Sequence, residues 1–212
     1  MTDKKKLAII MLGAPGSGKG TQGEILEQKT GFKRYVMSDM LKKELAKGSE
    51  MYDRVFKKGI LLSDGDVFLI FRKYFGCENE VIIDGIPRTL DQAYWLYGFL
   101  MHNNYEIKLV YLVVDEKKLL KRIISRKYCP KCHTLYNDIT KKPKKLGYCD
   151  YDGEVLIQRE DDTKEVFSGR LKTFDEIKNV ILAVYKAEMI EVDGDLEIDE
   201  VSKSITKKII TR

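Results

Sequence analysis

A glycine-rich stretch near the start of the chain, GAPGSGKGT at residues 13–21, could bind a phosphate. It follows an apolar run at residues 7–12 that predicts a buried strand, and a helix is predicted from Gly20 onward. A loop between a strand and a helix directs backbone N–H groups and the positive helix end at one point, which suits a phosphate. Lys19 would add a point charge for the outer phosphates. Gly20 replaces the hydroxyl residue that usually serves Mg²⁺, so we expect Thr21 or a carboxylate such as Asp84 to take that role.

A second candidate motif, DGIPRT at residues 84–89, directly follows the apolar residues 81–83. Asp84 is expected at the carboxyl edge of a parallel sheet, where ligands of such sheets bind. Arg88 carries a planar guanidinium that suits a pair of phosphate oxygens. Thr89 and Gln92 have the spacing of a helix capping box, and for Gln92 this structural role and a substrate contact remain equally open.

Four arginines flank one segment of the chain. Arg122 and Arg126, at the start of the segment around residues 125–162, are four residues apart and are expected on one helix face. Arg159 and Arg170 lie at the other end of that segment. Each alone is typical of a solvated surface. Together near a phosphate loop they indicate phosphoryl transfer, which needs positioning and positive charge around the moving group.

The same segment contains CPKC at residues 129–132 and, sixteen residues later, CDYD at residues 149–152. This spacing indicates a structural zinc site with four protein ligands, Cys129, Cys132, Cys149 and Asp152. His133 is a rival for the fourth position, but its adjacency to Cys132 makes tetrahedral ligation awkward. No role is expected for Cys77.

The elements that must position these residues alternate along the chain. Strands are predicted at residues 7–12, 81–84, 108–114 and 189–192. One apolar helical stripe follows Asp115, which is expected to cap that helix, and another helix is expected from Asp162. This alternation predicts an α/β fold, a mostly parallel sheet flanked by helices. Residues 36–65, compact and helical, and 125–162 interrupt the pattern as inserts. The expected core is therefore residues 1–35, 66–124 and 163–212 of one domain.

Composition narrows the class of protein. The 212 residues are 43% hydrophobic and 33% charged, which is typical of a soluble globular domain. No apolar run approaches the roughly 20 residues that span a bilayer, and the apolar start is too short for a signal peptide. We expect a cytoplasmic protein without a membrane partner and without disulfides. The net charge of +5 suits a nucleotide more simply than a nucleic acid.

The stretches GAPGSGKGTQ, DGIPRTLDQA, RIISR, the Cys-Cys-Cys-Asp insert and REDD with its following arginine resemble the adenylate kinase family, in its variety with a zinc-bearing lid. The resemblance covers nearly the whole chain and explains Gly20, because this family has G-K-G-T in its loop. It implies reversible transfer from Mg-ATP to AMP, giving two ADP. It also implies a P-loop core, a monophosphate-binding insert at 36–65, a lid at 125–162 that closes over ATP, and a monomer.

The resemblance also implies roles for particular residues. The catalytic residues would be Lys19, Arg88, Arg126, Arg159 and Arg170. The ATP-binding residues would be Gly16, Ser17, Gly18, Lys19, Gly20, Thr21, Arg122, Arg126, Leu135 and Tyr136. The AMP-binding residues would be Met37, Lys42, Leu62, Gly85, Arg88, Gln92, Arg159 and Arg170.

Three residues depart from the family's monophosphate signature S-T-G-D-x-L-R, which is VMSDMLK here. Met37 replaces a threonine, Ser38 a glycine, and Lys42 a phosphate-gripping arginine, so a kinase for another nucleoside monophosphate is the alternative. Two further alternatives are a P-loop switch or hydrolase that uses a single nucleotide, and a zinc-ribbon nucleic-acid binder. The last is suggested by lysines 141, 142, 144 and 145 between the cysteine pairs.

Overall fold

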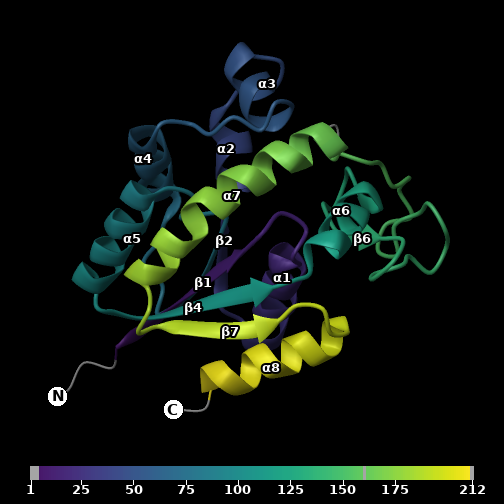
Figure 1. Ribbon diagram of the computed structural model, residues 1–212. Helices are drawn as coiled ribbons and strands as arrows, with labels where there is room; N and C mark the ends of the chain where they lie inside the picture. Colours follow the sequence, from purple (N-terminus) through teal and green to yellow (C-terminus); the bar gives the residue numbers. More distant parts are fainter. Residues whose placement is uncertain (1–4, 160, 211–212) are drawn as a thin grey trace.

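The computed structural model describes residues 5–159 and 161–210 and is built on a five-stranded parallel sheet (Figure 1). The strand order is β2-β3-β1-β4-β7. These strands are β1 (Lys6–Gly13), β2 (Lys33–Val36), β3 (Glu80–Asp84), β4 (Tyr105–Val113) and β7 (Met189–Asp193). The sheet confirms the α/β fold class expected from the sequence.

The side chains of β1 alternate between two apolar clusters, one on each face of the sheet. Ala8, Ile10 and Leu12 belong to one cluster, and Ile9 and Met11 belong to the other. All five are at most 4% exposed, so the strand is buried on both faces. A strand in this position reads as a continuous apolar run, which is why the sequence revealed it.

Helices cover both faces (Figure 1). One face packs against α4 (Asp64–Tyr74), α5 (Leu90–His102) and α7 (Lys164–Val184), and the other against α1 (Lys19–Thr30) and α8 (Ile198–Ile210). A smaller cluster joins α6 (Glu116–Ile124) to α7 through Leu119, Ile123, Phe167 and Leu171. None of the helices in the described residues is long and apolar enough to cross a membrane.

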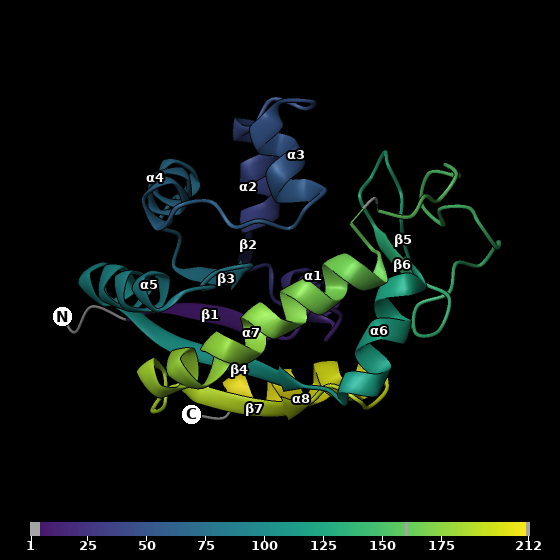
Figure 2. The ribbon, with the colours of Figure 1, turned by 45° about the horizontal axis from the view of Figure 1, so that its top comes forward.

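Two segments project from the carboxyl edge of the sheet (Figure 2). The first carries α2 (Met37–Glu44) and α3 (Glu50–Phe56). The second carries the antiparallel pair β5 (Arg126–Tyr128) and β6 (Leu135–Asn137) and a small core of Cys129, Tyr136, Cys149 and Leu156. We call them the insert and the lid, for residues 36–65 and 125–162.

The structure confirms the predicted strands and adds β2, which sequence reasoning missed. Asp115 caps α6 as expected, through a bond from the Lys117 backbone N–H to its carboxylate. The helix expected from Asp162 starts later, because Thr163 is the cap of α7 and Asp162 pairs with an arginine instead. Residues 1–4 and 211–212 of the expected core and Glu160 of the REDD stretch lie outside the described residues.

Candidate active site

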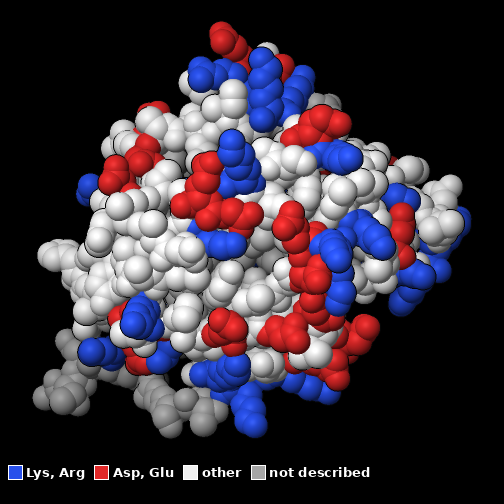
Figure 3. Space-filling view, viewed as in Figure 1, with Lys and Arg blue, Asp and Glu red and all other residues white. Residues whose placement is uncertain are grey.

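A cavity of about 1480 Å³ lies among the glycine loop, the insert and the lid. Every residue that the resemblance implied for ATP or AMP lines it. Figure 3 shows Lys and Arg side chains over the insert at the top and over the lid at the right. Asp and Glu side chains lie among them, but Lys and Arg outnumber Asp and Glu in the lining of the cavity itself, which attracts a polyanion.

The glycine loop joins β1 to α1 and forms the floor of this cavity. Gly16 and Gly18 have φ values of 84° and 99°, a left-handed conformation that side chains rarely adopt. Gly18 precedes the first residue of α1, so its conformation aims the helix N-terminus at the loop. Gly20 lies between lid and sheet, because a Cβ placed there would be 3.4 Å from Leu135 Cδ1 and 3.8 Å from Asp84 Oδ2.

Lys19 folds back over the loop that precedes it. Its Nζ donates to the carbonyl oxygens of Gly13 at 2.6 Å and Ala14 at 3.0 Å. The pKa of Lys19 is lowered to about 8, mainly by burial; Asp84 opposes this shift, while the charges of Arg88 and Arg126 add to it. Within the described residues the hydrogen bonds of the ammonium go to carbonyl oxygens, and a phosphate oxygen would replace these dipoles with a full negative charge.

Arg88 stands at the end of the loop that leaves β3. Its Nε donates to the carbonyl oxygen of Gly85 at 2.9 Å, which aims the guanidinium into the cavity. The surrounding protein and then the nearby Arg170 lower its pKa, although the side chain still meets solvent inside the cavity. Asp84 and Asp161 offset only part of this effect, so an anion bound beside the two arginines would be favoured.

Acidic residues at the base of the lid hold two other arginines. Arg126 makes a bidentate ion pair with Asp162, whose side chain is fully buried. Arg170 on α7 pairs with Asp161 at 2.7 Å between Nη1 and Oδ2. Neighbouring residues of one turn thus orient an arginine of the lid and an arginine of the core toward the same cavity.

Arg159 completes this group from the lid. Its guanidinium lies over the ring of Tyr128, 5.7 Å from the centroid. Burial lowers its pKa, and the charge of Arg126 lowers it further. The structure therefore brings Arg88, Arg126, Arg159 and Arg170 to one cavity, and Arg122, the remaining arginine of the four that the sequence groups around the lid, lines it as well.

The far end of the cavity lies between α6, the lid and the turn after β7. Arg122 donates from Nη2 to the carbonyl oxygen of Gly194 at 3.0 Å and lies 3.7 Å from Asp195 Oδ1. Gly194 and Leu196 line the cavity, and sequence reasoning missed both. This turn has no recognisable sequence motif. It reaches the site only because β7 pairs in parallel with β4.

Tyr136 lines the cavity, but its ring is buried in the lid. It is 2% exposed, and its hydroxyl accepts from the Asp150 backbone N–H at 2.8 Å and lies 3.5 Å from Cys149 Sγ. Leu135 is the neighbour that faces the glycine loop. A ligand in the cavity would thus meet the Leu135 side chain and, at Tyr136, mainly the edge of β6.

The insert supplies a mostly apolar wall. Met37 is 3% exposed and packs against Gly85, where a Cβ would lie 3.2 Å from Met37 Cβ. Leu62 lines the same wall. Lys42 also lines the cavity, and its Nζ lies 3.6 Å from Asp39 Oδ1. Because two-fifths of the Lys42 side chain is exposed, it has room to turn toward a ligand.

Gln92 is held at the start of α5, where Thr89 caps the helix by accepting from the Gln92 backbone N–H. The expected reciprocal bond is shifted by one residue, because Gln92 Oε1 accepts from the backbone N–H of Arg88 at 2.8 Å. The amide of Gln92 therefore fixes the backbone from which Arg88 reaches into the cavity.

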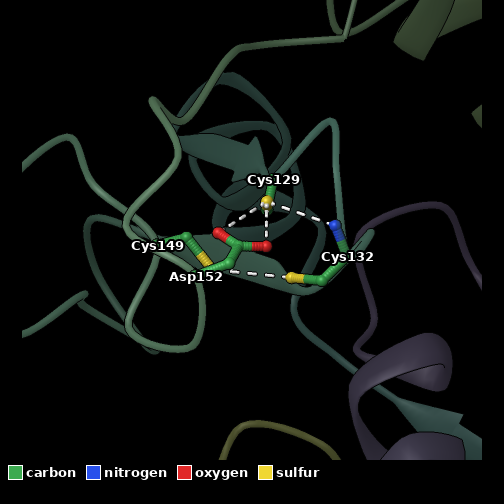
Figure 4. A group of neighbouring side chains, drawn as sticks. All are labelled: Cys129, Cys132, Cys149 and Asp152. Atoms are coloured by element: carbon green, nitrogen blue, oxygen red, sulfur yellow. Dashed lines mark hydrogen bonds between the residues drawn. The ribbon is translucent and has the colours of Figure 1, made fainter.

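The lid also holds the four residues expected to bind a metal (Figure 4). The ligand atoms of Cys129, Cys132, Cys149 and Asp152 all lie within 4.8 Å of one another. Cys132 Sγ and Cys149 Sγ are 3.5 Å apart, close to the separation of about 3.8 Å that two sulfurs have when each is about 2.3 Å from one tetrahedral zinc ion. His133 is not part of this group. The backbone of His133 instead has a left-handed conformation, with a φ of 61°, in the turn between Cys132 and β6.

A parallel sheet with a glycine loop at the end of its central strand, a lysine folded over that loop and a set of converging arginines defines a P-loop kinase of small phosphorylated substrates. The family model described as adenylate kinase matches residues 11–190. The chain belongs to the adenylate kinase family and is thus an enzyme of the nucleoside monophosphate kinase class.

Similar proteins named adenylate kinase match this chain over most of its length and most of their own. The adenylate kinase of onion yellows phytoplasma is 31% identical, over 97% of this chain and 99% of the relative. Those of Kosmotoga olearia and Mesoplasma florum are 35% and 38% identical, over 95% and 84% of this chain and 98% and 86% of the relative. The resemblance that the sequence motifs indicated is therefore confirmed for the family.

Proposed function

We propose that this chain transfers the terminal phosphoryl group of Mg-ATP reversibly to AMP, giving two ADP. The observation that carries the proposal is the single cavity, which joins the glycine loop, the arginines and the insert. A cavity of about 1480 Å³ has room for two nucleotides, whereas a single ligand pocket typically has about 300–1,000 Å³. Membership of the adenylate kinase family supports the same pair of substrates.

The donor nucleotide would bind with its phosphates on residues 16–21. Lys19 would exchange its two carbonyl partners for phosphate oxygens, since a charged oxygen is the stronger acceptor. Arg122 and Leu135 would enclose the base from the lid side, next to Gly194. Mg²⁺, which neutralises phosphate charge in such reactions, would be held near Asp84, an acid 8% exposed at the end of β3.

The acceptor would bind between the insert and α5. Met37, Leu62 and Gly85 would pack against its base, and Gln92 would meet the edge of that base. Arg88 and Lys42 would bind its phosphate, with Arg159 and Arg170 between acceptor and donor. The apolar wall suits a planar base, and the cations suit the charge that forms on the moving group.

Transfer would be direct, without a phosphorylated enzyme. Donor and acceptor would be held in line, while the arginines hold the charge that spreads over the equatorial oxygens. Water is a competing acceptor, so the lid must exclude it, and Leu135 above Gly20 already covers part of the glycine loop. The division into a core, an insert at 36–65 and a lid at 125–162 is part of this proposal.

We also propose that the lid binds a structural zinc ion through Cys129, Cys132, Cys149 and Asp152. Four protein ligands leave no open position, so the metal would stabilise the lid without activating water. Apart from the cysteines, the core that the described residues of the lid form contains only Tyr136 and Leu156, too little to fix its shape by packing. In metal analysis, Cys129→Ser should lose the metal, whereas Cys77→Ser, a matched cysteine outside the lid, should retain it.

The experiment for substrate choice is a coupled assay of ADP formation from Mg-ATP, with AMP, CMP, UMP and GMP offered separately to the purified chain, which we expect to be a monomer. We expect activity with AMP. A clear preference for another monophosphate would keep the reaction type and support the alternative that Met37 and Lys42 suggested. ADP formation without any monophosphate would instead indicate a hydrolase and contradict the proposal.

A further inference from the structure

The side-chain amide of Gln92 is fixed at both ends by the protein. Its Oε1 accepts from the Arg88 backbone N–H at 2.8 Å, and its Nε2 donates to Asp64 Oδ1 at 2.7 Å. Gln92 is 2% exposed, yet it lines the large cavity. An amide that is swapped end for end would put its N–H₂ against the Arg88 N–H and its oxygen against a carboxylate, so only one orientation is favourable.

Asp64 is the first residue of α4 and binds two residues of another element. Besides Gln92 Nε2, its Oδ1 accepts from the Thr89 hydroxyl at 3.0 Å. Asp64 therefore connects the end of the insert to the first turn of α5. Asp64 is absent from the cavity lining, so it would act on a ligand only through Gln92.

After these bonds the amide keeps one N–H on Nε2 and one lone pair on Oε1. A ligand in the cavity would thus meet a donor and an acceptor side by side, in an order that the protein sets. A 6-aminopurine offers a matching pair, the acceptor N1 and the donor amino group. A 6-oxopurine offers the reverse pair, a donor N1–H and an acceptor O6.

We propose that Asp64 is a positioning residue that determines the base specificity of the acceptor site by fixing the orientation of the Gln92 amide. The inference rests on the proposed function, because it takes the acceptor base to lie against Gln92. To accept a 6-oxopurine, Gln92 would have to turn its amide over and place its oxygen against the Asp64 carboxylate. That arrangement leaves a donor and an acceptor unpaired in a buried place, which strongly disfavours binding.

The test compares AMP with IMP, which differ only at the 6-position of the purine and the adjacent N1. The chain and its Asp64→Asn variant are assayed with both monophosphates at fixed Mg-ATP, and kcat and KM are measured separately. We expect the ratio of kcat/KM for AMP to that for IMP to fall about tenfold in the variant, because the carboxylate, which can only accept, is replaced by an amide that can turn over and donate to Gln92 Oε1 instead. The change should lie in KM, with kcat for AMP nearly unchanged.

Two controls distinguish positioning from general damage. Asp66→Asn, two residues further along α4, removes an exposed carboxylate that accepts from Ser63 Oγ and should leave the ratio unchanged. In the Gln92→Leu background, Asp64→Asn should have no further effect on the ratio, because no amide remains to be oriented. Asp64→Ser provides a second variant if Asp64→Asn does not fold.

The outcomes separate this inference from the proposed function. If the unmodified chain transfers phosphate to AMP but Asp64→Asn and Asp64→Ser keep its AMP preference over IMP, the positioning role is wrong. The same holds if Asp64→Asn changes the ratio equally with and without Gln92. If the unmodified chain does not use AMP, the proposed function itself fails.

Discussion

The ion pair between Arg126 and Asp162 gives the sharpest prediction about how the lid is held. The carboxylate is fully buried and Arg126 is 21% exposed, and Nε and Nη2 of the arginine bind its two oxygens. Removing one partner of a buried pair typically costs about 3–5 kcal/mol, because the other charge is left without a partner. Since a fifth of Arg126 can hydrate, we expect Asp162→Asn to lower the free energy of unfolding by about 2–3 kcal/mol.

For a chain of this size each kcal/mol lowers Tm by about 2–4 °C, so the variant should melt about 4–12 °C lower. Because Arg126 also lines the cavity, kcat should fall together with Tm. Calorimetry and the ADP assay measure the two effects. Asp175→Asn is the matched control, because it breaks an exposed pair with Lys178 on α7 and should cost at most about 0.5 kcal/mol. Equal Tm values for Asp162→Asn and Asp175→Asn would refute this account of the pair.

Three further predictions concern the phosphate sites and the metal. Lys42→Arg should lower the KM for AMP severalfold, because a guanidinium binds a phosphate through two parallel bonds; an unchanged or higher KM would count against placing Lys42 at the acceptor phosphate. Because burial lowers the pKa of Lys19 to about 8, its charged form prevails below that pH, and kcat/KM for Mg-ATP should decrease as the pH rises past about 8. A pH profile that stays flat to pH 10 would contradict this assignment. Removal of zinc by a chelator, verified by metal analysis, should lower the melting temperature before it affects activity, and an unaltered melting profile would refute the structural role.

Sequence reasoning identified the sheet because its central strands are buried on both faces and therefore read as apolar runs. It missed β2, whose four residues Lys33–Val36 include two with cationic side chains. This strand lies at the edge of the sheet, where solvent admits polar side chains and the apolar signal weakens. It also placed the start of α7 too early, because Asp162 is a good cap by type but is used by Arg126.

The candidate site was predictable where one local motif contains the chemistry. The glycine loop, Arg88 and the cysteine pairs are of this kind, since their spacing alone indicates a phosphate or a metal. Asp64 was not predictable in this way, because its partners Thr89 and Gln92 are more than twenty residues away and only the packing of α4 beside α5 joins them. The inward direction of the Tyr136 ring was equally hidden, because the alternation of so short a strand does not show which face is the lid core.

The central claim, phosphoryl transfer from one nucleotide to another and not to water, is tested most directly by following the label of ATP that carries ³²P in its γ-phosphate when the chain is mixed with Mg²⁺ and unlabelled AMP. The account predicts that the label passes into ADP without release of labelled phosphate, and that Lys19→Met and Arg88→Ala abolish this transfer. Label released as inorganic phosphate, at a rate that does not depend on AMP, would contradict it.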